Sequence, residues 1–343
     1  MAIRDVIDAL IDLFIPQIRN AFQAAIQDVV DNVILNELMK ALESGDVEAA
    51  FRTLGFSDAA MRPLTAVIER AFETGGIMTG RTFPRYLNTP SGKTVFRFDV
   101  RNSRAEAYLR DHSSQLITRI RDDTRVAVRN VMTDGMKLGD NPRTTALDII
   151  GRVDPVTKQR VGWIVGLTPG QERWVSSARN KLVNLDENYF NLELRDKRSD
   201  SVVARAIRDG KPLDRATVDR LITNYKNNAL RYRGETIART EAMQSLNQSE
   251  HEAIKQAVDL GAVNESAVRR HWDSAGDKRV RWSHKRMDTT YDKKGVGLDE
   301  PFKSPSGALM MFPGDTSLGA PGDEVIMCRC RVRLKVDWLA DID

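Results

Sequence analysis

The only two cysteines of the chain, Cys328 and Cys330, are one residue apart in the stretch EVIMCRCRVRL, near its C-terminal end. In a strand, residues i and i+2 point to the same face, so both sulfur atoms should project to one side. A disulfide across one intervening residue would be strained. The sequence therefore favours two free thiols or two thiolates that share a ligand.

Zinc binds Cys, His and carboxylate side chains in a tetrahedral arrangement. The C-terminal region offers several further ligands: His271, His284, Asp273, Asp277 and Asp288. His284 and Asp288 are four residues apart and would share one face of a helix. We therefore predict a structural zinc site made of Cys328, Cys330 and His284 with one further ligand, for which Asp288 is a candidate. The alternative is that both cysteines are small core residues without a metal.

Other catalytic signatures are scarce. The sequence shows no glycine-rich phosphate loop, no Gly-x-Ser-x-Gly elbow and no His-Glu-x-x-His helix. The remaining histidines fall in charged or polar helical stretches and are expected to face solvent: His112 and His251. A nuclease could use His284 as general acid–base, with Asp288 beside it and Arg279 or Arg281 holding a phosphate. Because no second acid–base partner is evident, this enzyme is only the alternative hypothesis.

The elements that would carry these residues are predicted from hydrophobic periodicity. The chain is expected to be mainly α-helical, with a multi-helix N-terminal and central region and a small C-terminal α+β module. Four parts are predicted: acidic N-terminal helices for protein docking (1–76), a loop with short strands (77–103), a basic central helical domain (104–268) and the α+β module (269–343). Helix interruptions are predicted at Pro16, Gly75–Gly76 and Gly234, and a helix end at Gly261.

Charge is unevenly distributed along the 343 residues. The net charge is +4 overall, −6 for residues 1–75, +8 for 76–268 and +2 for 269–343. This asymmetry suggests a protein partner for the first part and a polyanion for the second. Arg121, Arg125 and Arg129 recur every four residues and would form a basic helical stripe. The stripe is either a solvated face, partly neutralised by neighbouring aspartates, or a DNA-facing surface that contacts phosphates without reading sequence.

Membrane and secretory signals are not evident. The longest apolar candidate, IDALIDLFIPQI, is short and carries two Asp and a Pro. The N-terminus lacks a basic region followed by an uninterrupted apolar stretch. We therefore expect no membrane contact and synthesis in a cytoplasm.

Four motifs follow one another in the last third of the chain. They are Arg239-Thr240-Glu241 in a helix; Trp272 followed by Asp277, Arg279, Arg281 and His284; Pro313-Gly314-Asp315; and Cys328-Arg329-Cys330. In this order they resemble the phage Mu F-like minor head protein family, also called phage head morphogenesis proteins, over about residues 230–334. Two positions depart from the family pattern: Thr289 replaces a usual Gly after Asp288, and Met327 replaces a usual Asn.

The resemblance implies a structural component of the virion, made in the cytoplasm of a bacterial host. It would lie inside the phage head near the portal vertex and aid head assembly and DNA packaging or ejection. The implied partners are the portal protein, the major capsid or scaffold proteins, and double-stranded DNA bound without sequence specificity. The family does not imply an enzyme. Within this frame we predict that Glu241 pairs with Arg279 or Arg281. A zinc-stabilised adaptor without DNA contact is a further alternative.

Overall fold

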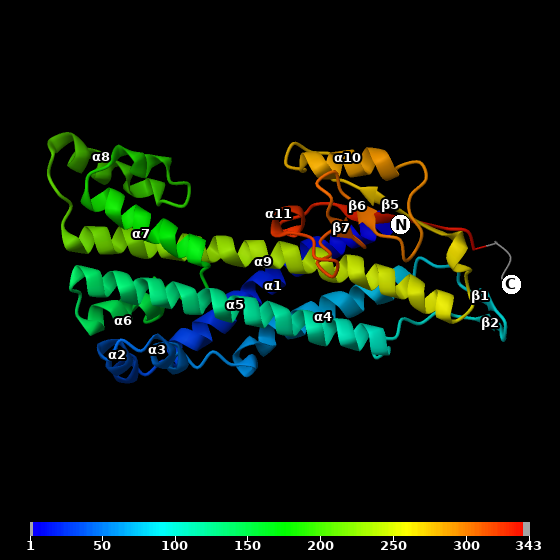
Figure 1. Ribbon diagram of the computed structural model, residues 1–343, viewed down its shortest axis with the longest axis horizontal. Coiled ribbons are helices and arrows are strands. Elements are labelled where there is room, and N and C mark those ends of the chain that lie inside the picture. The colour runs from blue at the N-terminus through cyan, green and yellow to red at the C-terminus, as the bar shows by residue number, and fades with distance from the viewer. Residues whose placement is uncertain (1–2, 339–343) are drawn as a thin grey trace. The chain divides into compact units, whose positions relative to one another are not determined.

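The computed structural model describes residues 3–338 (Figure 1). It is mainly α-helical with small two-stranded sheets, which confirms the predicted fold class. The helices are α1 (Ile3–Asp31), α2 (Leu35–Glu43), α3 (Val47–Thr53), α4 (Asp58–Gly80), α5 (Ser103–Leu138), α6 (Pro142–Ile150), α7 (Pro169–Val183), α8 (Asp200–Asp209), α9 (Arg215–Asp259), α10 (Trp282–Tyr291) and α11 (Gly322–Val325). The strands pair antiparallel as β1 (Leu87–Thr89) with β2 (Gly92–Thr94), β3 (Arg152–Val153) with β4 (Arg160–Val161), β5 (Val268–Asp273) with β8 (Arg331–Val336), and β6 (Phe302–Lys303) with β7 (Leu309–Met310).

The residues pack into two compact units. Unit 1 contains the described residues up to Asn20, residues Leu64–His112 and the described residues from Glu235 onward. Unit 2 contains Ala21–Pro63 and Ser113–Gly234. Helices α1, α4, α5 and α9 each contribute residues to both units. Every boundary between the two units therefore falls inside a helix, whereas α5 begins at Ser103 and β5 at Val268.

Several helices start where their capping residues predict. The Ala60 amide donates to Ser57 Oγ at the start of α4. Thr168 forms a capping box with Gln171 at the start of α7, where Pro169 is the first helical residue. Residues 77–103 contain short strands, as expected: β1 and β2 form an antiparallel hairpin.

Three predicted interruptions are wrong. Helix α1 runs through Pro16 and α9 runs through Gly234. A proline inside a helix removes one hydrogen bond, yet residues on both sides of Pro16 are firmly buried, among them Phe14 and Ile18. Packing of a continuous apolar face therefore outweighs the local cost.

The glycine pair of α4 does not end that helix either. Gly75 and Gly76 lie inside α4, which continues to Gly80. A Cβ atom on Gly75 would lie 2.2 Å from Ser249 Oγ on α9. Glycine is therefore required there by close helix packing within unit 1, a reason that the local sequence does not show.

Unit 2 is a helical assembly with an aliphatic core. Helix α2 packs against α3 and α6. The fully buried side chains come mainly from α1, α5, α6 and the segment before α7: Phe22, Ile26, Val30, Val128, Ile149 and Val165.

The C-terminal part of unit 1 forms a small α+β module, residues 268–336. In Figure 1 the module, orange to red, lies against the C-terminal half of α9. Strands β5 and β8 pair with Trp272 opposite Val332, and α10 packs against β5. Its core is small and contains both cysteines: Trp272, Val280, Met287, Val296, Phe302, Met310, Phe312, Val325, Cys328, Cys330 and Val332.

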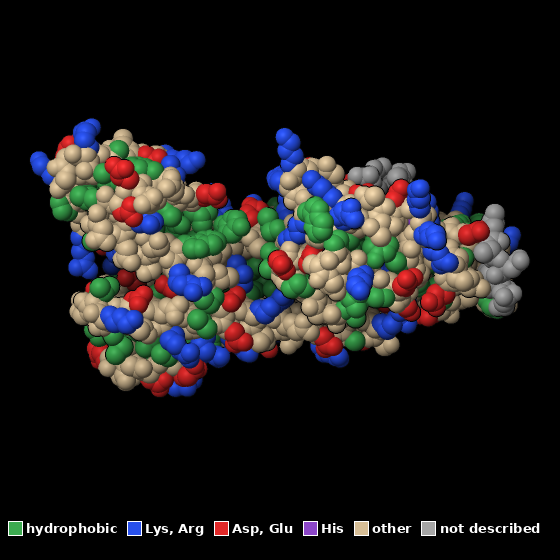
Figure 2. Space-filling model, turned by 45° about the horizontal axis from the view of Figure 1, so that its top comes forward, with side chains coloured by type: hydrophobic (Ala, Val, Ile, Leu, Met, Phe, Trp, Pro, Cys, Tyr) green, Lys and Arg blue, Asp and Glu red, His purple; other side chains and the backbone are tan. Residues whose placement is uncertain are grey.

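Among the described residues, 3–338, no helix is both long and apolar enough to cross a bilayer. On the face drawn in Figure 2, Lys and Arg side chains are interspersed with Asp and Glu over most of the area.

Candidate metal centre and its support

The two cysteines lie in the segment that directly precedes β8. The predicted strand begins only at Arg331, so Cys328 and Cys330 are outside it. Their side chains nevertheless point the same way, and each is 1% exposed. Arg329 points away from them, and its Nη1 lies 2.9 Å from Asp277 Oδ2. The expected alternation along this segment is therefore present.

His284, in the first turn of α10, completes a group of three possible metal ligands. Its Nδ1 lies 3.5 Å from Cys328 Sγ and 3.3 Å from Cys330 Sγ. All three ligand atoms lie within 4.8 Å of one another. In a tetrahedral site with Zn–S of about 2.3 Å and Zn–N of about 2.0 Å, neighbouring N and S ligands are roughly 3.5 Å apart. The three side chains therefore fit a zinc ion almost without movement.

Glu324 supports the far side of the His284 ring. Its Oε2 lies 2.9 Å from His284 Nε2, although the angle is poor for a hydrogen bond. Ser283 Oγ donates to Glu324 Oε2 at 2.9 Å, and Ser306 Oγ donates to Oε1 at 2.5 Å. Burial opposes ionisation of Glu324, but the two serines and His284 together lower its pKa. A metal-binding histidine usually has a carboxylate on its second nitrogen, and Glu324 occupies that position.

The two thiols also interact with each other. The hydrogen bond from Cys330 lowers the pKa of Cys328 well below its usual range, and His284 adds to this effect. The same hydrogen bond, together with burial, raises the pKa of Cys330. One sulfur of the pair is therefore poised as a thiolate, which is the form that binds metals.

Asp288 does not join this group. Its Oδ2 accepts a hydrogen bond from Ser274 Oγ at 2.6 Å, and it is not among the residues at metal distance. Within residues 3–338, three of the four predicted ligands come together and a fourth protein ligand is not supplied.

The geometry disfavours the alternative nuclease. His284, the proposed general acid–base, is 1% exposed, and the Asp288 carboxylate accepts a hydrogen bond from Ser274. The guanidinium of Arg281 donates to the carbonyl of Ile326. The Cys328–His284–Glu324 arrangement resembles a nucleophile with its base and orienting acid, but a buried sulfur has no access to a substrate.

The other motif residues hold the module on α9. Thr240 Oγ1 accepts from the Met327 amide at 3.1 Å, which fixes the segment before the cysteines. Asn247 Nδ2 donates to the Pro313 carbonyl at 3.1 Å, and its Oδ1 accepts from the Val332 amide at 3.4 Å. Side chains seven residues apart on one face of α9 thus bind the backbone of two separate loops and β8.

The Pro-Gly-Asp motif builds the loop that faces α9. Gly314 has φ of +90°, and a Cβ atom there would lie 3.7 Å from Gln244 Cα. Asp315 is 1% exposed and accepts from the amides of Met311 and Ser317, both at 2.8 Å. A glycine for the conformation and an aspartate for the turn are therefore both required.

Comparison with protein families gives a match to this same region. Residues 199–333 match the family described as Phage Mu protein F like protein. This segment is similar to the Mu F-like family. The family is one of phage head morphogenesis proteins. Searches of curated proteins and of solved structures gave no match.

The Mu F-like segment covers about two fifths of the chain and starts earlier than the predicted residue 230. It includes α8, all of α9 and the C-terminal module up to Arg333. The motifs that suggested the family therefore lie at its C-terminal end, and its first helices carry no motif that we recognised.

One predicted contact of the Mu F-like motif is wrong. Glu241 is not joined to Arg279 or Arg281; its Oε2 lies 2.5 Å from Nε2 of His112 on α5. His112 is 5% exposed, so the prediction that it faces solvent is also wrong. His251 is only half-buried, and burial lowers its pKa to about 3. The flanking charge misled the prediction for His112, because Asp111 is exposed on another face of the helix. For His251 the flanking Glu250 and Glu252 are themselves buried.

Arg239, unlike Thr240 and Glu241 of the same motif, lies near other positively charged side chains. Burial lowers its pKa, and the nearby charges of Arg329 and Arg279 add to that effect. Three arginines of the Mu F-like motifs thus approach one another at the edge of the module.

Sequence reasoning missed Arg270 on β5. This arginine is 1% exposed and donates to the backbone carbonyls of Gly297, Glu300 and Met311. Burial lowers its pKa to about 10. The signal that could have found it is weak: an arginine in a strand that otherwise reads as buried.

The predicted DNA-facing stripe lies in unit 2. Arg125 stacks over Phe51 at 4.8 Å and lies 3.4 Å from Glu48 Oε2. Arg129 lies 3.9 Å from Glu48, while Arg121 is half-buried. Helix α3 therefore covers much of this stripe.

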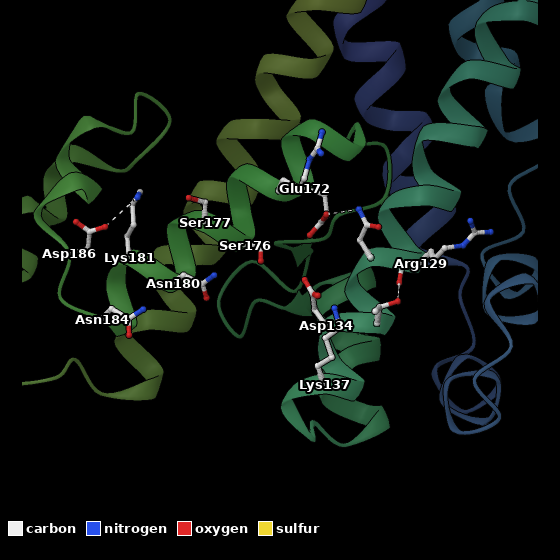
Figure 3. Close-up of a pocket in the computed structure, with 13 residues that line it drawn as sticks. Arg129, Asp134, Lys137, Glu172, Ser176, Ser177, Asn180, Lys181, Asn184 and Asp186 are labelled. Atoms are coloured by element: carbon white, nitrogen blue, oxygen red, sulfur yellow. Dashed lines mark hydrogen bonds and ion pairs between the residues drawn. The ribbon is translucent and has the colours of Figure 1, made fainter.

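Arg129 also borders a polar groove of about 670 Å³ between α5 and α7 (Figure 3). Acidic and basic groups alternate along the groove, including Asp134, Lys137 and Glu172. Burial raises the pKa of Glu172, and Asn130 donates to it at 3.0 Å. Its mixed charge does not favour a polyanion.

Proposed function

We propose that this protein is a minor head protein of a tailed phage that lies inside the head near the portal vertex. It would aid head assembly and the packaging or ejection of DNA. The observation that carries the proposal is the family match, reinforced by side chains of α9 that fix the module in place. The portal protein is its first partner, and the major capsid or scaffold proteins are further ones.

The docking surface that we propose is the acidic part of α2 and the turn after it. Its exposed carboxylates include Glu37 and Glu43. Removal of residues 1–76 would not test this surface, because those helices supply core residues such as Ile18 and Leu64. Charge reversal of exposed side chains is the better test.

The experiment is co-expression with the portal protein and measurement of how much portal co-purifies. The double variant Glu37→Lys/Glu43→Lys should lose most of the portal. The matched control is Glu187→Lys/Glu193→Lys, which makes the same charge change at exposed sites in unit 2 and should keep it. Equal retention by both variants would refute docking through α2, and absence of the chain from the portal region of intact particles would refute the location.

Zinc at the candidate metal centre is the second part of the proposal. The two thiolates and the imidazole would hold it, and it would tie α10 to the segment before β8. Bound zinc supplies cross-linking and folding free energy here, not catalysis. The packed-thiol alternative predicts the same burial but no metal.

Metal analysis of protein purified without chelators distinguishes the two. About one zinc per chain is expected in the natural sequence, and Cys328→Ser should lose it. The control Ser274→Ala alters a neighbouring polar contact of the module without touching a ligand, and should keep the metal. Natural-sequence protein without stoichiometric metal would establish the packed-thiol reading.

A further inference from the structure

Basic side chains gather on the outer face of α10 and on the turn that precedes it. We name this the C-terminal basic surface; its members are Lys278, Arg279, Trp282, Lys285 and Arg286, with Arg239 and Arg329 at its edge. The first five are exposed. Figure 2 shows Lys and Arg side chains around a hydrophobic patch in the part of the surface where α10 lies.

This surface contains little compensating charge. Asp277 is shared: Arg329 Nη1 lies 2.9 Å away and Arg279 Nε 3.8 Å away, while Glu235 and Asp12 lie near Arg239 at the edge. Among the residues that the structure describes, Lys285 and Arg286 make no ion pair. A carboxylate shared by two guanidinium groups leaves a net positive charge, and clustered cations of this kind favour binding of an anion.

The contrast with the predicted α5 stripe is informative. There, Arg125 lies near both Glu48 and Asp122, and Arg129 shares Glu48. Intramolecular carboxylates already pair with two of the three arginines of the stripe. The C-terminal basic surface keeps most of its cations available.

An exposed tryptophan within the C-terminal basic surface favours nucleic acid as the anion that it binds. Trp282 is 69% exposed at the first position of α10 and lies one turn from Arg286. A large aromatic side chain among arginines is typical of surfaces that contact nucleic acid, where the ring stacks or packs on the sugar and base while cations contact phosphates. An acidic protein surface would use the same cations, and Trp and Arg are also common at protein interfaces; the net positive charge around Trp282 favours the most highly charged polyanion, a nucleic acid.

We propose that the C-terminal basic surface, and not the α5 stripe, is the place where this protein contacts the phosphate backbone of double-stranded DNA. The inference rests on the proposed function, which supplies DNA as a partner. It specifies the residues of the contact: Lys285 and Arg286 on the helix, Arg279 on the turn, and Trp282 between them.

The test measures binding of the full chain to a fluorescent DNA duplex by anisotropy between about 50 mM and about 200 mM salt. The variant Lys285→Glu/Arg286→Glu should weaken binding roughly tenfold or more, because two phosphate contacts are lost and repulsion is added. The slope of log affinity against log salt should fall by about 1 for each lost contact.

Two matched controls make the same type of change elsewhere. Arg205→Glu/Arg208→Glu alters two exposed arginines of α8, and Arg129→Glu alters the α5 stripe. Both should bind DNA within about threefold of the natural chain, the scale of a long-range charge effect. Circular dichroism and thermal unfolding should be unchanged in all three variants. An equal or larger loss in either control would overturn the assignment of the site.

Further outcomes separate DNA from other polyanions. Polyglutamate should compete poorly with the duplex, whereas equal competition would mean a general anion site and would overturn the choice of DNA. Trp282→Ala should weaken binding severalfold, and more on single-stranded DNA, where stacking is available.

Loss of portal co-purification without loss of DNA binding in Lys285→Glu/Arg286→Glu would assign this surface to the portal. Failure to find the protein near the portal in particles would refute the proposed location and leave this measurement intact.

Discussion

Unit 2 and the C-terminal module bury different kinds of side chain. The fully buried residues of unit 2 are largely aliphatic, such as Ile26 and Ile149. In the module, Arg270 and His284 are as deeply buried as the core phenylalanines. Each of these polar groups has particular neighbours: three carbonyl groups for Arg270, and two sulfur atoms for His284.

This difference explains why the recognisable sequence motifs lie in the C-terminal module and not in unit 2. Aliphatic residues of similar volume can replace one another in a helical core, so unit 2 can keep its fold with many sequences. A buried polar group must keep its partner, because an unpaired one costs its full desolvation free energy. The module therefore depends on specific residues at specific spacing, and such residues are what a motif records.

The largest effect that the comparison predicts is at Arg270. Arg270→Met should lower the free energy of unfolding of the module by about 3–5 kcal/mol, because it leaves buried carbonyl groups of Gly297, Glu300 and Met311 without a donor. Amide hydrogen exchange resolves this loss from the stability of unit 2, which should not change.

Arg269 is the matched control for that variant. It precedes Arg270 on β5, is exposed and contacts only local carbonyls. Arg269→Met should cost less than about 0.5 kcal/mol, as most surface substitutions do. A loss of similar size in both variants would contradict the special role of the buried guanidinium.

The next effect concerns a buried carboxyl of α9 in unit 1. Glu250 is 1% exposed, neither of its oxygens has a hydrogen-bond partner, and burial raises its pKa to about 8. The folded state therefore binds a proton that the unfolded state, with a pKa near 4.5, releases. Stability should fall as pH rises from about 4.5 to about 8, by up to about 1.4 kcal/mol for each pH unit.

Glu250→Gln should remove that slope, since glutamine stays neutral at every pH. Glu252→Gln is the control on the same helix: Glu252 is also buried, but its Oε1 lies 3.1 Å from Arg104. This second variant should lose stability at neutral pH and leave the slope in place. Unfolding measured at a series of pH values checks both, and an unchanged slope in Glu250→Gln would assign the pH dependence to other groups.

A smaller effect is expected in the core of unit 2. Ile149 is fully buried on α6, and Ile149→Val should cost only about 0.5–1.5 kcal/mol. A conservative change of the buried arginine, Arg270→Lys, should cost more than this, because lysine cannot donate to three carbonyl groups in the same plane. Comparable losses in the two variants, measured by chemical unfolding, would remove the distinction between the two regions.

Much of the fold and part of the site could be predicted from the sequence, because they depend on particular residue types at particular spacing. The ordered motifs placed His284 with the two cysteines, since both the residue types and the spacing are unusual. Asp288 was placed wrongly because position on a helix face does not show that Ser274 competes for its carboxylate. Helix continuity at Pro16 and Gly234 depends on tertiary packing, which local signals do not contain.

The partners of charged residues were the least predictable feature. Glu241 binds His112, which is 129 positions away along the chain, and Arg125 binds Glu48 from another helix. Because the chain has many acidic and many basic side chains, many ion pairs of similar strength are possible. The sequence alone does not show which of them form. The fold selects the pair by bringing particular helix faces together.

The smallest predicted effect is a gain of stability, at a departure from the family pattern. Met327 has φ of +58°, a conformation that costs a residue with a long side chain free energy and that asparagine tolerates better. That backbone angle gives a physical reason for the Asn that is usual in the family at this position. Met327→Asn should raise the free energy of unfolding of the module by about 0.5–1 kcal/mol while the amide keeps its bond to Thr240. Ile326→Asn, at the exposed neighbour with ordinary φ, should give no gain; thermal unfolding of both variants decides whether the backbone or the added amide group is responsible.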